Sequence, residues 1–149
     1  MRPILKRMTM KQYSIAYLAT LVAFVAIDFV WLSTMADRLY RPILGDLLAP
    51  DFRVAPAIAF YLLYAAGLSF LAVRAGLMSG SLRTAALHGA VVGVTSYATY
   101  DLTNQSTLNN WSTFLTIADL SWGALLSAVA AAAGFWTTQR LVEYLDRNE

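Results

Sequence analysis

The sequence has no cysteine and a single histidine, His88, among its 149 residues. The lack of cysteine excludes disulfides, thiolate metal sites and a cysteine nucleophile. One histidine cannot supply a di-iron centre or a bis-histidine haem, and no second catalytic partner stands near it for a nucleophilic triad. No glycine-rich phosphate-binding loop is present either. We therefore expect neither a metal nor a cofactor.

Charge is also scarce. Asp, Glu, Lys and Arg make up 13% of the chain and hydrophobic residues 58%, whereas soluble domains have about 25% and about 45–50%. The mean hydropathy is +0.54. This composition excludes disorder and is typical of a membrane protein whose main partner is the lipid bilayer. The lysines and arginines are not clustered on one face, so nucleic acid is not an expected partner.

The few charges divide the chain into long apolar segments. A helix rises about 1.5 Å per residue, so it needs roughly 20 residues to cross the hydrocarbon core. Continuous apolar runs favour helices over a barrel, whose strands alternate. We predict an all-α integral membrane four-helix bundle that forms one transmembrane domain over residues 1–149. The predicted spans are about 13–35, 54–73, 82–100 and 112–136.

The basic residues predict the orientation. Eight of them fall in the N-terminal segment, the 74–83 connection and the C-terminal tail, and three fall in the 36–53 connection. The positive-inside rule therefore predicts that both termini face the cytoplasm (N-in/C-in) and that the 36–53 connection lies outside. Leu39, Ile43 and Leu47 recur at helical spacing there, which predicts a short helix in the membrane interface.

Two acids lie inside predicted spans, where a carboxylate is costly. Asp28 and Asp119 are each followed three residues later by a tryptophan, Trp31 and Trp122, on the same helix face. Because both acids lie about seven residues from the outer end of their spans, we expect them to face one shared cavity. Like charges so close do not both ionise cheaply, so at least one is expected to be protonated near neutral pH. The alternative is a structural hydrogen-bond network that holds the helices together.

More polar residues gather at the end of the third span. Tyr97, Asp101 and Asn104 follow the spacing of one helix face. Asp101 is expected to be more exposed than the other two acids, because it lies where the predicted span ends. Tyr61 or Tyr97 is expected to donate a hydrogen bond to a buried acid. The candidate ligand-binding residues are Asp28, Trp31, Tyr61, Tyr97, Asp101, Asn104, Asp119 and Trp122.

Five segments resemble a bacterial membrane-protein family, domain of unknown function 2177 (DUF2177). The segments are Asp28 to Ser33, Tyr40 to Gly45, Phe60 to Tyr64, Tyr97 to Asn104 and Asp119 to Gly123. The resemblance extends from about Met10 to about Trp136, and Met10 matches the family's usual start, which makes residues 1–9 an extension or a misplaced start. It implies a four-span protein of the bacterial inner membrane and brings no established reaction.

Three functions stay open. The first is binding or transport of a small amphipathic or cationic ligand, or a lipid, at an outer-leaflet acidic and aromatic site. Because four spans are few for a transporter, a transporter of this kind is expected to be a homodimer. The second is a lipid-modifying enzyme, or its accessory subunit, in which the paired acids transfer protons. The third is a structural partner in a larger membrane complex. A water-filled pocket toward the outer surface would favour the first, an open groove toward lipid the second, and a dry bundle with fully bonded acids the third.

Overall fold

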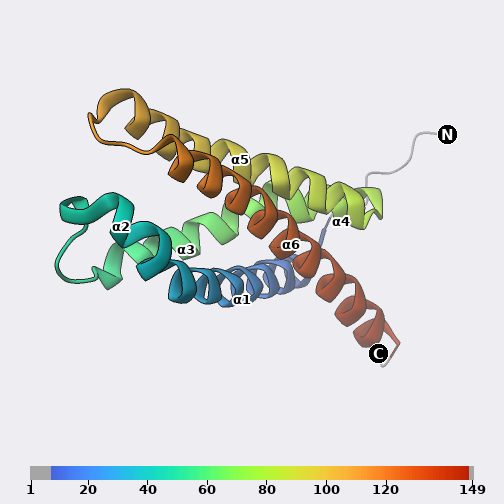
Figure 1. The fold of residues 1–149 in the computed structure, drawn as a ribbon. Coiled ribbons are helices and arrows are strands. Elements are labelled where there is room, and N and C mark those ends of the chain that lie inside the picture. The colour runs from blue at the N-terminus through green and yellow to red at the C-terminus, as the bar shows by residue number, and fades with distance from the viewer. Residues whose placement is uncertain (1–7, 148–149) are drawn as a thin grey trace.

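The computed structural model describes residues 8–147. In this part of the chain four helical rods run antiparallel to their neighbours in sequence (Figure 1), so the all-α prediction is confirmed. The first rod is α1 (Met10–Met35), extended by η1 (Ala36–Tyr40), α2 (Arg41–Leu44) and η2 (Gly45–Leu47). The second is α3 (Val54–Leu68), η3 (Ser69–Val73) and α4 (Arg74–Ser79), the third is α5 (Leu82–Thr107) and the fourth is α6 (Thr113–Asp146).

The two ends of the bundle differ. At one end, which we call the terminal end, α1 begins, α4 meets α5 and α6 finishes (Figure 1). At the other end, which we call the loop end, lie α2, the start of α3 and the turn between α5 and α6. α1, α5 and α6 begin at polar caps, Thr9, Ser81 and Ser112, whose side chains accept from free backbone N–H groups. Thr9 and Gln12 form a capping box, with bonds of 3.2 and 2.9 Å.

Small residues bring α5 and α6 into close contact in the half of the pair nearer the terminal end. A Cβ atom on Gly93 would collide with the carbonyl oxygen of Gly123, and one on Gly89 would lie 2.5 Å from the Ser127 carbonyl oxygen. Only hydrogen fits at these positions. Gly89 and Gly93 form a G-x-x-x-G pair, the pattern that lets membrane helices approach closely.

Three of the four rods are long and apolar enough to cross a membrane: Met10–Leu47, Val54–Ser79 and Thr113–Asp146. Within residues 8–147, α5 does not reach the same hydropathy, because threonine, serine and asparagine recur along it. Insertion of α5 therefore stays a prediction. The N-in/C-in orientation also stays a prediction, and three of the basic residues behind it, Arg2, Lys6 and Arg7, lie outside the described residues.

The helices extend beyond the apolar segments that predicted them. α5 continues to Thr107 instead of ending near Tyr100, and α6 continues to Asp146 instead of ending near Trp136. Hydropathy marks the part of a helix suited to lipid, whereas the backbone hydrogen bonds continue through polar residues. The 36–53 connection holds three short helical segments that end at Leu47, and its place in the membrane interface stays a prediction.

Candidate acidic site

A cavity of about 390 Å³ lies at the loop end, and all four rods contribute to its wall. Figure 1 shows α5 leading away from α3 toward this end, while α5 packs against η3 and α4 nearer the terminal end. The cavity lies at the level where the rods diverge. Its lining residues are Asp28, Leu32, Tyr40, Phe60, Tyr64, Ser96, Tyr97, Tyr100, Asp101, Asp119 and Trp122.

Asp28 is buried and doubly hydrogen-bonded. Only 5% of the residue is exposed. The Tyr61 hydroxyl donates to its Oδ2 at 2.8 Å, and the Trp122 indole N–H donates to its Oδ1 at 3.1 Å. The expected hydrogen bond from Tyr61 is therefore present, and it joins α3 to α1.

Asp119 is held by a residue that the sequence did not single out as a site residue. The Tyr40 hydroxyl donates to Asp119 Oδ1 at 2.7 Å and accepts from the Trp31 indole N–H at 3.0 Å. Asp119 is 6% exposed and, like Asp28, lines the cavity. The two acids thus share one cavity, as expected from their similar depth.

The two Asp-x-x-Trp segments are linked reciprocally. Trp122, from the segment of Asp119, donates directly to Asp28, whereas Trp31, from the segment of Asp28, reaches Asp119 through Tyr40. The two indole rings stack with centroids 4.2 Å apart and planes 10° apart. The arrangement joins α1 to α6.

Asp101 is the most buried of the three acids, with 0% of its surface exposed. The prediction that it is the most exposed is wrong. The cause is the position of the helix end, because α5 continues past Asp101 to Thr107. Asp101 also continues the series Gly89, Gly93 and Tyr97 at intervals of four, and the glycines of this series contact α6.

Neither carboxylate oxygen of Asp101 has a hydrogen-bond partner among the described residues. A buried polar atom without a partner costs free energy, and such atoms are rare in folded proteins. Asp101 nevertheless lines the cavity beside Asp119 and Asp28. The cavity therefore contains two carboxylates that the protein's own donors bind and one that they do not.

The family comparison covers this whole region. Residues 13–136 match DUF2177, a family of predicted membrane proteins. The chain belongs to the DUF2177 family. No curated protein and no solved structure matches it. This DUF2177 protein is therefore a multi-pass membrane protein in contact with the lipid bilayer.

The other candidate residues of the DUF2177 protein take different places. Tyr97 lines the cavity and packs its ring against Gly123. Trp31 is stacked on Trp122 and is not among the lining residues. Asn104 is half-buried beyond Asp101 on α5 and is also outside the lining.

The predicted site residues did not include four lining residues that carry hydroxyl groups. These are Tyr40, Tyr64, Ser96 and Tyr100. Tyr64 is hydrogen-bonded to Ser127 at 2.8 Å, which links α3 to α6. The pattern Gly89-x-x-x-Gly93 was the available signal that α5 presents this face to a neighbouring helix. The local sequence around Tyr40 does not indicate that Asp119 is its partner, because 79 positions separate the two residues.

The composition of the cavity limits its chemistry. No lysine or arginine is among the residues that line it, whereas three aspartates are. Across residues 8–147, no group of three or more histidine, cysteine or acidic residues is placed to hold a metal ion. The cavity therefore offers acceptors for hydrogen-bond donors and for positive charge, surrounded by aromatic side chains.

Proposed function

We propose that this DUF2177 protein binds a small amphipathic amine, with its ammonium group at Asp101 and its apolar part between α3 and α5. The observation that carries the proposal is the buried, unpartnered carboxylate of Asp101. An ammonium supplies N–H donors and the opposite charge at once, and such charge-assisted hydrogen bonds are the strong ones. Binding would satisfy the atoms that the protein leaves unsatisfied.

The surroundings of Asp101 favour a cation over a neutral or anionic ligand. Asp28 and Asp119 line the same cavity, and no basic residue does. Tyr97 and Tyr100 also line it, and aromatic rings attract a cation. The volume of about 390 Å³ lies within the range of about 300–1,000 Å³ that is typical of small-molecule pockets.

The apolar part of the ligand has a place beside the acids. Phe60 on α3 and Tyr100 on α5 both line the cavity, and both are exposed on the surface of the bundle. An acyl or alkyl chain that leaves the cavity between these two rings would enter the surrounding lipid. Its burial would add about 0.8 kcal/mol per methylene group.

The test measures binding of dodecylammonium to the purified protein in neutral-lipid nanodiscs by calorimetry. Asp101→Asn is expected to weaken binding at least about tenfold, because a charged partner is lost. Asp37→Asn is the matched control, since it removes the same charge from an exposed residue that pairs with Arg41, and it is expected to bind normally. Dodecanol measures partitioning of the chain alone. Equal binding by wild type and Asp101→Asn would contradict the proposal.

A lipid-modifying enzyme, or its accessory subunit, is the second candidate, because two residues that line the cavity with the acids, Phe60 on α3 and Tyr100 on α5, are exposed on the bundle surface. Here Asp28 and Asp119 would transfer protons to or from a lipid group. The test compares the lipid composition of a deletion strain complemented with wild type, Asp28→Asn or Asp119→Asn. Restoration by wild type alone would support the enzyme. An unchanged lipid profile after deletion would contradict it.

A further inference from the structure

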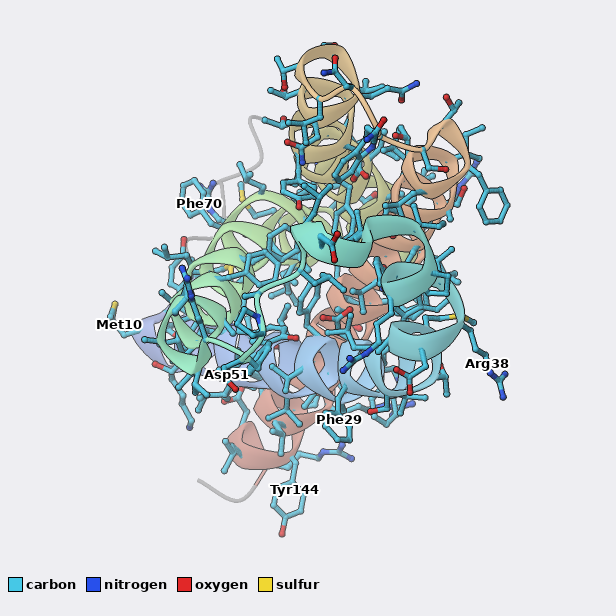
Figure 2. The ribbon with its side chains drawn as sticks, turned by 60° about the vertical axis from the view of Figure 1, so that its left-hand side comes forward. Met10, Phe29, Arg38, Asp51, Phe70 and Tyr144 are labelled. Carbon is cyan, nitrogen blue, oxygen red and sulfur yellow. The ribbon has the colours of Figure 1, made fainter. Side chains whose placement is uncertain are left out.

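A second cavity, of about 930 Å³, is lined by the end of α1 and by the connection that leads from α1 to α3. Figure 2 brings this end of the molecule forward and labels Asp51 on that connection. Arg41, Asp46, Asp51 and Arg53 all line this outer cavity. Charged groups of both signs are suited to water and to the polar headgroup region. The exposed rings of α3 and α5 are suited instead to the apolar part of the membrane.

The outer cavity and the acidic cavity have two residues in common, Leu32 and Tyr40. Tyr40 is the polar one. Its hydroxyl is fixed by two hydrogen bonds, from Trp31 and to Asp119. The side chain therefore forms part of the partition between a charged outer space and the buried acids.

The helical turn that ends at Tyr40 is also unusual. Tyr40 ends the π-helical turn Ala36–Tyr40, in which the Arg41 N–H bonds to the Ala36 carbonyl. Pro42 follows and has no N–H to continue an ordinary helix. Single π-helical turns are frequent at functional sites.

We propose that Tyr40 closes a passage between the outer cavity and the acidic cavity, and that the charged end of the ligand enters by this passage when the Tyr40 side chain turns aside. An ammonium that has passed Tyr40 competes with the Tyr40 hydroxyl for Asp119 and so favours the open position of the side chain. The apolar part follows the ammonium and comes to lie between α3 and α5. The inference rests on the proposed function for the ligand, whereas the passage is tested without a ligand.

The absence of cysteine makes the passage measurable. Asp101→Cys places the one thiol of the protein in the acidic cavity, and a membrane-impermeant trimethylammonium thiosulfonate reagent is added to one side of sealed vesicles at a time. Tyr40→Ala is expected to raise the modification rate at least about tenfold from the side of the outer cavity, because it shifts the population toward the open passage. Tyr40→Phe keeps the ring and removes both hydrogen bonds, so a smaller increase is expected.

Tyr61→Ala is the matched control. Tyr61 also donates to a buried aspartate, but it lines neither of the two cavities. A rate unchanged by Tyr61→Ala supports the passage, and an equal increase contradicts it. Ser69→Cys reports on the packed interior, because Ser69 is buried and lines neither of the two cavities. An equal acceleration there by Tyr40→Ala would show general loosening and also contradict the passage.

Two further results separate the proposals. If Asp101→Cys does not fold, Tyr97→Cys reports from the same cavity. No acceleration by Tyr40→Ala at either position overturns the passage, even if dodecylammonium binds. Acceleration together with failure of dodecylammonium to bind supports the passage and overturns only the amine proposal.

Discussion

The α5–α6 pair is closely packed in one half and hollow in the other. Toward the terminal end, Gly89 and Gly93 touch the α6 backbone at Ser127 and Gly123. Toward the loop end, the same face of α5 continues with larger residues, and a cavity opens beside α6. The spacing of four residues is the same in both halves. The size and polarity of the side chains decide whether the two helices close on each other or leave room for a ligand.

The comparison separates stability from function. The glycine half holds the backbones together, whereas the acidic half contains the unpartnered carboxylate of Asp101. A protein often gives up some stability at a site that must bind something else. Gly93→Ala in the first half and Asp101→Leu in the second are therefore expected to change the free energy of unfolding in opposite directions, and four predictions follow that comparison.

The largest effect is expected at Gly93. Gly93→Ala places a methyl group against the Gly123 backbone, which cannot move aside cheaply, so the free energy of unfolding should fall by about 3 kcal/mol. Gly67→Ala is the control, because nothing lies within 4 Å of its Cβ position; it should raise stability by up to about 1 kcal/mol. Unfolding by dodecyl sulfate, followed by circular dichroism, measures both. If Gly93→Ala and Gly67→Ala were equally stable, the close packing of the glycine half would be contradicted.

Asp101 should respond in the opposite direction. Asp101→Leu removes the buried unpartnered carboxylate, so the ligand-free protein should gain about 1–3 kcal/mol of unfolding free energy while losing amine binding. Asp119→Leu should instead destabilise, because it leaves the Tyr40 hydroxyl without its acceptor. The same unfolding titration measures both variants. Destabilisation by Asp101→Leu would argue that its carboxylate has a structural role.

A smaller loss is expected at Trp122. Trp122→Phe removes the N–H that donates to Asp28 but keeps an aromatic ring beside Trp31. Hydrogen bonds within membrane proteins average about 0.6 kcal/mol and reach about 1.7 kcal/mol, so we expect a loss of about 1 kcal/mol. Trp136→Phe, on an exposed face, should change little. A loss at Trp136 that matches the one at Trp122 would contradict a specific role for the hydrogen bond.

The smallest effect is expected at the border between the halves. Tyr64→Phe and Ser127→Ala each remove the same 2.8 Å hydrogen bond, at a cost of about 0.6 kcal/mol. Because the bond is lost only once, the double variant should lose no more unfolding free energy through this bond than either single variant. A double-mutant cycle on the unfolding free energy measures this coupling. Simple additivity would show that the two hydroxyl groups do not depend on each other.

Much of the fold could be predicted because the signals are local. Scarcity of charge and the length of the apolar segments predicted four helices, and the costly position of Asp28 and Asp119 predicted that both turn inward. The starts of α5 and α6 lie at or within one residue of the expected Leu82 and Ser112. These features depend on residues close together in the sequence.

The parts that were missed depend on contacts between distant residues. The burial of Asp101 depends on α5 continuing to Thr107 and facing α6. The role of Tyr40 depends on a π-helical turn that directs its hydroxyl to Asp119. Neither the length of a helix beyond the apolar segment nor a partner across the bundle is visible in hydropathy.

The stacked tryptophans give the protein an optical property of its own. Trp31 and Trp122 come from α1 and α6, and their rings lie nearly parallel with centroids 4.2 Å apart. Two indoles at this separation share their electronic excitation, so their absorption should split and give a paired positive and negative circular dichroism band. The intensity of that band depends steeply on the distance and angle between the rings. Any event that moves α1 relative to α6 would thus be recorded in the ultraviolet spectrum of the unlabelled protein.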